Sequence, residues 1–362
     1  MISDSFVLGL CAIGMFIHSD SVFFRSDSLL KVNLRSAGGH YFILDDSGHQ
    51  VDVTALEDSK GVAYWHRRIK TEVCQTGECK LVDIGLYWDC TGDFFGLEVY
   101  GEHLTKTDHS IFLSEDYDRL ISILSNDWSI LREYDFSDLT TPVNSFPGNN
   151  KEVDATSGAT RKEIASEAVK DAVYTTYTLW HLVHGGENEQ LEELTVKRLN
   201  DESCVQALLA ASVEKYDYFL LSLLVESKIR QSESLNRLVL RALESKSDPL
   251  LRDLAVKSLA REDVNAASFQ NEVASVYERS TLDIRLQMLT ALKETKQVHA
   301  RLGSALEADL TVENEWLALK ILPVLMKAQE ISDETLEAVR KLTKSNNSQL
   351  KARADEFLKV AE

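Results

Sequence analysis

The sequence predicts an α+β domain followed by an all-α solenoid, and two observations support this fold class. Before Gly185 and Gly186, aromatic, Thr-rich and β-branched stretches are separated by turn residues, which is typical of short strands. After these glycines, amphipathic helix patterns follow one another with few glycines or prolines. A chain of 362 residues can form two or three domains. We therefore expect an α+β domain over residues 27–185 and a solenoid over residues 186–362.

The composition is that of a folded protein with an acidic surface. Hydrophobic residues make up 44% of the chain and charged residues 27%. The formal net charge of −19 argues against a nucleic-acid partner, because a phosphate backbone requires clustered Lys and Arg.

One apolar run, from Phe6 to Ile17, lies near the N-terminus. It is too short to span a bilayer, and its length suits the hydrophobic part of a signal peptide. We therefore predict a signal peptide over residues 1–26 and a periplasmic or otherwise extracytoplasmic protein. No Lys or Arg precedes the run, and a buried N-terminal strand or helix is the alternative.

Cys74 and Cys79 are the two cysteines that stand close together in the sequence. Thr76 and Gly77 between them predict a turn, so the thiols can face each other across a tight loop. In an oxidising compartment this favours a local disulfide. No second Cys or His pair stands at a spacing suited to zinc, so we assign no metal ligands.

The first domain is expected to contain strands, a helix and a loop in that order. Residues 29–55 predict three short strands, and the run from Lys80 to Tyr100 predicts a hairpin around Gly92. Residues 115–133 show helical spacing, and residues 140–150 carry two prolines, a glycine and three asparagines, which is typical of a loop.

A long helix is predicted from Thr160 to His184, with Gly185 as its C-terminal cap. Its apolar face is formed by Ile164, Ala168, Val169, Ala172, Val173, Thr176, Trp180 and Val183.

The second domain contains a repeat of 33 residues. The aligned apolar positions are Leu251, Ile284, Leu317 and Leu350, then Ala255, Met288, Ile321 and Ala354, then Leu259, Leu292, Leu325 and Leu358. A fixed period of this kind indicates stacked helical pairs, each of which buries its apolar face against its neighbours. The pattern resembles HEAT-like repeats and implies a HEAT-like α-solenoid.

Residues 154–160, Asp-Ala-Thr-Ser-Gly-Ala-Thr, carry the chemistry. They resemble the flavinylation signature D-x-x-[ST]-G-A-[TS] of the FMN-binding domain family, which includes the FMN-bearing subunits of the sodium-pumping NADH:quinone oxidoreductase and of the Rnf complex. The resemblance implies an α+β FMN-binding domain in which FMN is covalently joined to Thr160 through a phosphoester. It also implies a cofactor-binding motif completed by Asp154, Ser157, Gly158 and Ala159. The alternative is an ordinary helix start with Ser157 or Thr160 as cap.

The predicted position of Thr160 at a helix start is consistent with a phosphoester. Unpaired backbone N–H groups and the helix dipole favour an anion there, and Gly158 allows close approach of the backbone. Arg161 and Lys162 add positive charge.

The resemblance covers about residues 70–185, including the hairpin with Gly92 and Gly96. Residues 101–109 replace the Pro-Gly segment of the family, so contacts to the isoalloxazine ring are not assigned. The candidates for such contacts, with a solvated loop or core packing as the alternative, are His103, Lys106, Asp108, His109, Tyr87, Trp88, Tyr174, Tyr177, His181 and His184.

These observations predict an electron carrier rather than an enzyme with its own substrate, and no catalytic residue is assigned. The resemblance implies a separate flavin transferase and redox partner proteins, among them a membrane-associated electron donor. Two other functions stay open: a HEAT-like binding scaffold with a degenerate flavin domain, and a flavin-dependent reductase of a small molecule.

Overall fold

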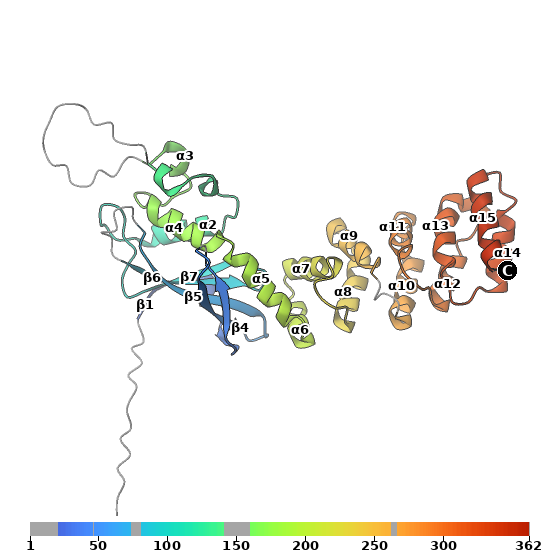
Figure 1. Ribbon diagram of the computed structural model, residues 1–362, viewed down its shortest axis with the longest axis horizontal. Helices are drawn as coiled ribbons and strands as arrows, with labels where there is room; N and C mark the ends of the chain where they lie inside the picture. The colour runs from blue at the N-terminus through green and yellow to red at the C-terminus, as the bar shows by residue number, and fades with distance from the viewer. Residues whose placement is uncertain (1–20, 46, 74–80, 141–159, 262–265, 362) are drawn as a thin grey trace, which may run out of the picture. The chain divides into compact units, whose positions relative to one another are not determined.

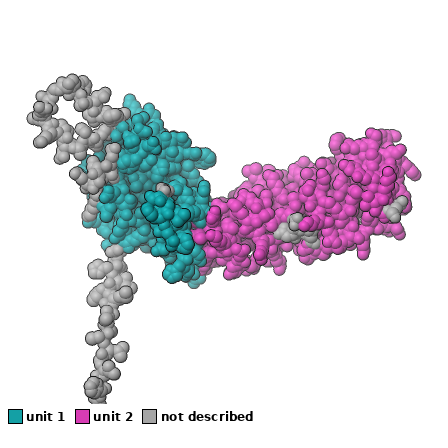
Figure 2. All heavy atoms as spheres, viewed as in Figure 1, with its two compact units in different colours: residues 1–56, 64–190 teal, residues 57–63, 191–362 magenta. Residues whose placement is uncertain are grey.

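The computed structural model describes residues 21–45, 47–73, 81–140, 160–261 and 266–361 (Figure 1). They form two compact units: residues up to 56 with 64–190, and residues 57–63 with 191 onward (Figure 2). The first unit combines an antiparallel sheet with helices, and helices then follow to the end of the described chain. The coarse prediction of an α+β part followed by an all-α part is therefore confirmed.

The sheet of unit 1 has the strand order β1-β7-β6-β5-β4-β2, and β3 pairs with β4. The strands are β1 (Val22–Arg25), β2 (Arg35–Ser36), β3 (Tyr41–Leu44), β4 (Gln50–Glu57), β5 (Ala63–Thr71), β6 (Val82–Asp89) and β7 (Phe94–Tyr100). Because β1 pairs with β7, the sheet of unit 1 includes residues 22–25. The apolar run of the predicted signal peptide lies outside the described residues.

The predicted hairpin is confirmed as β6 and β7, which pair in antiparallel register. Gly92 in its turn has φ +82°, a conformation that favours glycine. A Cβ at Gly92 would lie 2.6 Å from the carbonyl oxygen of Asn188, so the turn also requires a residue without a side chain.

The first of the three strands expected within residues 29–55 is wrong. Leu29 and Leu30 belong to the short helix α1 (Asp27–Leu30). Ser28 donates a hydrogen bond to the carbonyl of Phe95, and the side chain of Leu29 occupies the space above Gly96. The segment therefore covers the sheet instead of extending it.

Helices cover one face of the sheet. They are α2 (Ser114–Leu124) and α4 (Val173–His184), with the 3-10 turns η1 (Ile130–Glu133) and η2 (Phe136–Asp138) beside α4. The helix expected over residues 115–133 thus divides into α2 and a separate turn. The fully buried Trp88 of β6 donates its indole N–H to the carbonyl of Val183 at 3.2 Å, which joins the sheet to α4.

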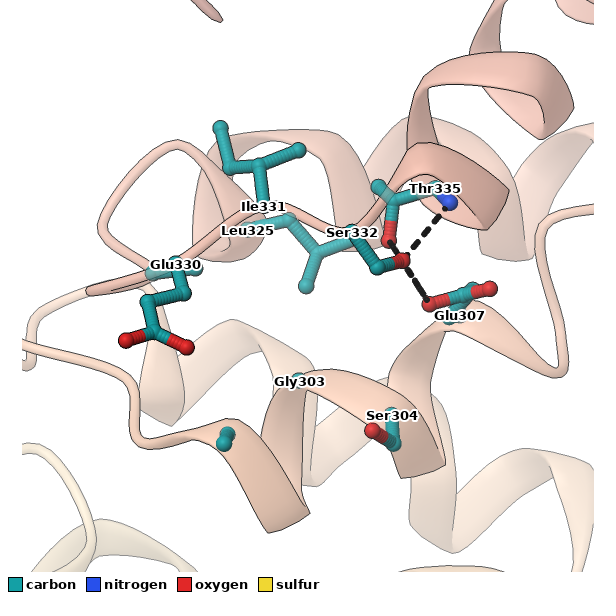
Figure 3. A pocket seen from close by; sticks show the side chains of 10 residues that line it. Gly303, Ser304, Glu307, Leu325, Glu330, Ile331, Ser332 and Thr335 are labelled. Atoms are coloured by element: carbon teal, nitrogen blue, oxygen red, sulfur yellow. Dashed lines mark hydrogen bonds between the residues drawn. The ribbon is translucent and has the colours of Figure 1, made fainter.

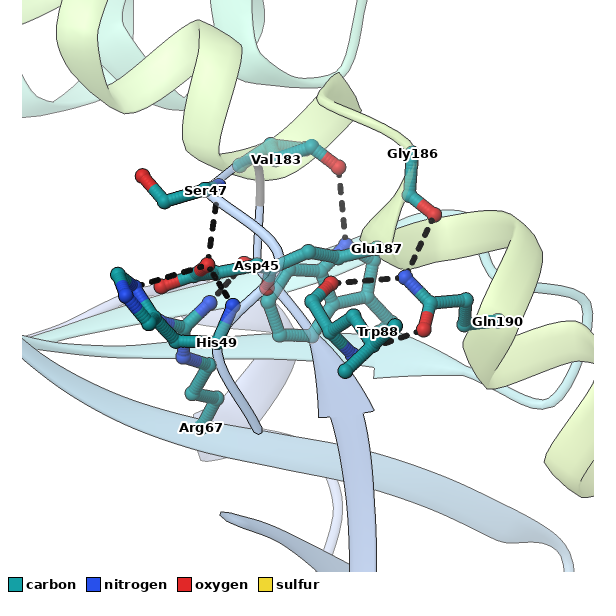
Figure 4. Close-up of polar contacts among 10 residues, drawn as sticks. Asp45, Ser47, His49, Arg67, Trp88, Val183, Gly186, Glu187 and Gln190 are labelled. Carbon is teal, nitrogen blue, oxygen red and sulfur yellow. Dashed lines mark hydrogen bonds and ion pairs between the residues drawn. The ribbon is translucent and has the colours of Figure 1, made fainter. Parts of the chain in front are cut away.

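Polar contacts join the segment after α4 to the sheet and shape the neighbouring turn between β3 and β4 (Figure 4). Asp45 accepts hydrogen bonds from the backbone N–H groups of Ser47 and His49 and so shapes the turn between β3 and β4. Arg67 of β5 forms a buried ion pair with Glu187. These contacts fix the chain just after α4.

The single helix expected from Thr160 to His184 is wrong. The structure has a four-residue helix α3 (Lys162–Ala165) and then α4. Between them Asp171 adopts φ +60°, and its carbonyl accepts hydrogen bonds from the backbone N–H and the hydroxyl of Thr107. The N–H of Val169 donates to the Thr176 hydroxyl, so tertiary contacts replace the helical ones. The expected apolar face is nevertheless buried at all its positions.

Unit 2 is built from paired helices whose layers stack along the chain (Figure 1). Helices α7, α9, α11, α13 and α15 contact one another in succession, and α6, α8, α10 and α12 do the same. The bounds are α5 (Glu187–Arg198), α6 (Glu202–Ala211), α7 (Glu214–Val225), α8 (Glu233–Leu243), α9 (Pro249–Ser258), α10 (Ala267–Arg279), α11 (Leu282–Leu292), α12 (Ala300–Glu307), η4 (Val312–Asn314), α13 (Glu315–Leu325), α14 (Asp333–Leu342) and α15 (Ser348–Ala361).

The positions that define the 33-residue period line the contact between these helices. Ala255, Met288, Ile321 and Ala354 fall in α9, α11, α13 and α15, and all four are fully buried. The last aligned position differs, because Phe357 is buried in α15 while Leu358 is only half-buried.

Ion pairs also connect successive helical pairs. Arg285 of α11 binds both carboxylate oxygens of Asp309, at 3.0 and 2.8 Å, and the hydroxyl of Tyr277 donates to the same carboxylate. Arg285 further donates to the backbone carbonyls of Tyr277, Glu278 and Ser280 at the end of α10. This one guanidinium therefore ties α10, α11 and the end of α12 together.

Across the part of the chain that the structure describes, no helix combines the length and apolarity needed to span a membrane.

Replacing Ile321 by Ala is expected to destabilise unit 2 by about 2–5 kcal/mol, because truncation of a buried Ile leaves a cavity. Thermal unfolding of the full chain, followed by far-UV circular dichroism, measures the effect. Lys320→Ala at the exposed neighbouring position is the matched control and should change stability by less than about 0.5 kcal/mol. Equal midpoints for the two variants would contradict the repeat packing.

Candidate functional site

Thr160 is the one residue of the flavinylation motif that lies within the described chain. It forms an isolated antiparallel bridge with Thr140, and its side chain is half-buried. The next residue, Arg161, donates its backbone N–H to the carbonyl of Leu139 at 3.2 Å. The backbone at Thr160 is therefore held against the end of η2.

The other predicted motif residues, Asp154, Ser157, Gly158 and Ala159, lie outside the described residues, as do Cys74 and Cys79. Of the cysteines that the structure describes, Cys90 is buried and Cys204 half-buried, and neither forms a disulfide there.

The expected contribution of a helix dipole at Thr160 is not supported. The helix that follows has four residues, begins after Thr160 and has no side-chain cap. A macrodipole requires several aligned turns, so α3 supplies little positive potential.

Arg161 supplies the positive charge at this point instead. Its Nη2 atom lies 3.7 Å from Oδ1 of Asp138, which is a long ion pair. Its Nε atom is buried and has no hydrogen-bond partner within the described residues. A buried donor without an acceptor costs about 1–3 kcal/mol, so an anionic group beside Thr160 would suit this guanidinium.

An aromatic cluster stands next to the bridge. The hydroxyls of Thr140 and Tyr174 are 3.2 Å apart, and Tyr174 packs against Phe136, with 4.9 Å between the ring centroids. Tyr177 meets the same Phe136 ring edge-on. These rings are connected to the bridge through the contact of Tyr174 with Thr140, the bridge partner of Thr160.

The other candidates on α4, which are Tyr177, His181 and His184, make packing contacts within unit 1. The hydroxyl of Tyr177 donates to the carbonyl of Tyr134, and His181 lies 3.3 Å from the carbonyl of Leu131. His184 hydrogen-bonds the carbonyl of Leu124, and burial lowers its pKa. These contacts hold α4 against η1 and α2.

The candidate residues of the segment 103–109, which are His103, Lys106, Asp108 and His109, do not form a common site. His103 packs against Phe23 with tilted rings, 3.8 Å between the centroids, while Lys106 pairs with Asp116 of α2. Asp108 and His109 are exposed, and Asp108 accepts hydrogen bonds from Ser110 within its own turn.

A second polar centre, which the sequence analysis missed, lies on the sheet face opposite Trp88. The carboxylate of Glu98 in β7 is almost fully buried. It accepts hydrogen bonds from the hydroxyls of Tyr87 and Tyr100, the former at 2.7 Å, and pairs with Arg25 of β1. Burial alone would raise the pKa of Glu98, but these donors outweigh it and hold the pKa below its ordinary value.

His66 completes this centre from β5. Burial lowers its pKa, so the imidazole is neutral at pH 7, and its buried Nε2 has no hydrogen-bond partner in the described part of the chain. A Cβ at Gly85 would lie 2.9 Å from both this nitrogen and the hydroxyl of Tyr100. Gly85 therefore allows these side chains to come together.

One signal for this centre was present in the sequence. Glu98 is the only charged residue in the apolar run from Phe94 to Tyr100, and an acidic side chain there requires a buried partner. Its cation, Arg25, stands 73 residues earlier, so only strand pairing reveals it.

A hollow of about 170 Å³ lies in unit 2 between α12, α13 and α14 (Figure 3). Glu307 at its rim accepts hydrogen bonds from Ser332 at 3.0 Å and Thr335 at 2.7 Å, where α14 begins. This carboxylate stabilises the helix start, so we interpret the hollow as part of the contact between neighbouring repeats.

Among the described residues, no three His, Cys, Asp or Glu side chains are grouped as a metal site requires.

Comparison of the chain with protein-family models, with curated proteins and with solved structures found no match. What the site at Thr160 can bind is therefore inferred from the residues around it.

Replacing Glu98 by Gln is expected to destabilise unit 1 by about 1–3 kcal/mol at pH 7, because Arg25 loses its buried counter-charge. Since the folded state lowers the pKa of Glu98, its stabilising effect is present above the unfolded value of about 4.3 and is lost as the pH falls through the lower folded value. Melting temperatures of both proteins between pH 7 and the acid limit of folding measure this.

The control for this experiment is Asp118→Asn, which removes an exposed carboxylate of α2. It should leave the melting temperature nearly unchanged at both ends of the pH range. A Glu98→Gln effect that stays constant with pH would show that the carboxylate charge is not what stabilises the fold.

Proposed function

We propose that this protein is an electron carrier with FMN joined covalently to Thr160 through a phosphoester. The observation that carries the proposal is the motif at residues 154–160, which ends on a half-buried threonine held at a fixed backbone position. FMN, when attached, would accept and donate the electrons.

The residues around Thr160 fit a phosphoester. The Nε of Arg161, which has no partner within the described residues, is a donor for a phosphate oxygen, and the contact of this guanidinium with Asp138 is long, at 3.7 Å. The Phe136 and Tyr174 rings form an apolar surface adjacent to the bridge, which suits the face of a planar ring system.

The attachment requires a separate magnesium-dependent flavin transferase, as the family resemblance implies. The Thr160 hydroxyl oxygen would bond to the FMN phosphorus of FAD, the pyrophosphate bond would break, AMP would leave and the hydroxyl proton would pass to solvent. No electrons are exchanged in this step. A tethered flavin is not lost to dilution, which suits the extracytoplasmic location that we propose for the protein.

Helical repeats suit a docking role beside such a carrier. Stacked helices present extended surfaces without a deep substrate pocket. We propose that unit 2, as a HEAT-like solenoid, holds redox partner proteins, which can include a membrane-associated donor.

Intact mass of the protein after co-expression with a flavin transferase tests the attachment. Wild-type protein should gain the mass of FMN less one water, and Thr160→Ala should not. Thr160→Ser should keep the modification, because the nucleophilic hydroxyl is retained. Thr140→Val, which alters the partner strand but not the hydroxyl, is the matched control. An unmodified wild type, while the transferase modifies a known acceptor, would disprove the proposal.

Arg161→Gln should reduce the flavinylation rate by about tenfold relative to wild type, because the phosphate loses a charge-assisted donor. Lys162→Gln removes an exposed charge one residue further along and should have a much smaller effect. Time courses of flavin fluorescence in denatured protein measure both rates. Equal rates for the two variants would rule out a specific role for the Arg161 guanidinium.

A further inference from the structure

Unit 2 exposes its large apolar side chains at particular places. Among its described residues, six such side chains are exposed: Val213, Leu250, Leu282, Val312, Trp316 and Val360. The first five stand at the start of α7, α9, α11 or α13, either in the first turn or just before it. Only Val360 lies elsewhere, near the end of α15. Apolar residues exposed by chance would be scattered over the surface instead.

The starts of these four helices form one edge of unit 2. Helices α7, α9, α11 and α13 contact one another in succession, and each is separated from the next in sequence by one returning helix, so all four run in the same direction. Leu250 and Trp316 occupy the same position of the 33-residue repeat, two periods apart. With 71% and 78% of their surfaces exposed, they are unpartnered on the solvent side.

Carboxylates accompany the apolar residues. Glu214, Asp283 and Glu313 directly follow Val213, Leu282 and Val312 in the sequence. All three carboxylates are exposed, and no ion pair of theirs is found in the described part of the chain, although Asp283 accepts a hydrogen bond from Gln287 at 3.4 Å. We refer to these five apolar residues and three carboxylates together as the apolar–acidic edge.

We propose that the apolar–acidic edge binds an extended segment of a partner protein that carries an apolar side chain at every third residue and Lys or Arg between them. Packed helices lie about 8–10 Å apart, so the edge presents one apolar contact per such interval. A polyproline II segment advances about 9.3 Å per three residues and returns its side chain to the same face at that interval. A β-strand returns to the same face after about 6.8 Å and does not match.

The carboxylates of the edge also favour a partner segment with Lys or Arg between its apolar residues. Cationic side chains between the apolar ones face the carboxylates of Glu214, Asp283 and Glu313, and the net charge of −19 attracts a basic segment over a longer range. An acidic or purely apolar segment lacks this complementarity. Because every residue of the edge belongs to unit 2, binding does not require a flavin on Thr160.

The test uses a fluorescently labelled peptide of Leu-Pro-Lys triplets, one triplet for each of the four helices. The full chain, produced without a flavin transferase, is titrated into the peptide and fluorescence anisotropy is measured. Saturable binding that weakens with added salt is expected. A peptide of the same composition with its Leu residues at every second position should bind about tenfold more weakly.

Variants of the edge make the test specific. The triple variant L250S, L282S and W316S should weaken peptide binding by about tenfold or more, while V360S, the matched control, should change it by less than about twofold. The variant E214Q, D283N and E313Q should weaken binding and flatten its salt dependence. Circular dichroism spectra identical to wild type establish that the exposed substitutions leave the fold intact.

Three results would overturn the proposal. The first is peptide binding that the triple variant leaves unchanged, and the second is the absence of saturable binding. The third is wild-type self-association, seen by sedimentation and abolished by the triple variant, without peptide binding, which would make a second copy of the chain the occupant. A failure of flavinylation at Thr160 alters neither measurement, so the two proposals fail independently.

Discussion

The hydrogen bond from the Trp88 indole to the carbonyl of Val183 is the contact on which the architecture of unit 1 depends. Trp88 lies in a central strand and is fully buried, so its large apolar surface is removed from water only if α4 covers it. The indole N–H must also find an acceptor in the core, and the end of α4 provides it. This pair sets the position of α4 relative to the sheet, and α4 in turn carries Tyr174, whose hydroxyl contacts Thr140.

The two faces of the sheet are stabilised by different interactions. On the helix-covered face, apolar burial dominates, with Trp65, Leu86 and Leu97 fully buried. On the opposite face, the buried carboxylate of Glu98 is stable because two phenol hydroxyls and one guanidinium satisfy it. A carboxylate in this position specifies the pairing of β1 with β7, because a shift in register would leave both charges without a partner.

Unit 2 depends on repetition rather than on a single centre. Each helical pair buries its small and branched side chains against the next, so stability is distributed over many similar contacts. Arg285 shows how one side chain can cap a helix end and bind the following repeat at the same time. These contacts use the side chains inside the repeats, whereas several large apolar side chains at the helix starts stay exposed.

The sequence by itself determined the features that follow from local patterns. The hairpin around Gly92, the break in character near Gly185 and the 33-residue period were all predictable, because alternation, turn residues and helical spacing act within a few residues. The motif at residues 154–160 identified Thr160 as the candidate site, although the structure describes only its last residue.

Only the tertiary structure decided the features that depend on distant partners. The helix after Thr160 is interrupted because Thr107 binds the carbonyl of Asp171, and apolar spacing alone cannot report a competing hydrogen bond. Glu98 finds Arg25 across a strand pair that joins residues 73 positions apart. Local propensity sets which segments can form helices and strands, whereas long-range hydrogen bonds and burial select where they end and which side chains meet.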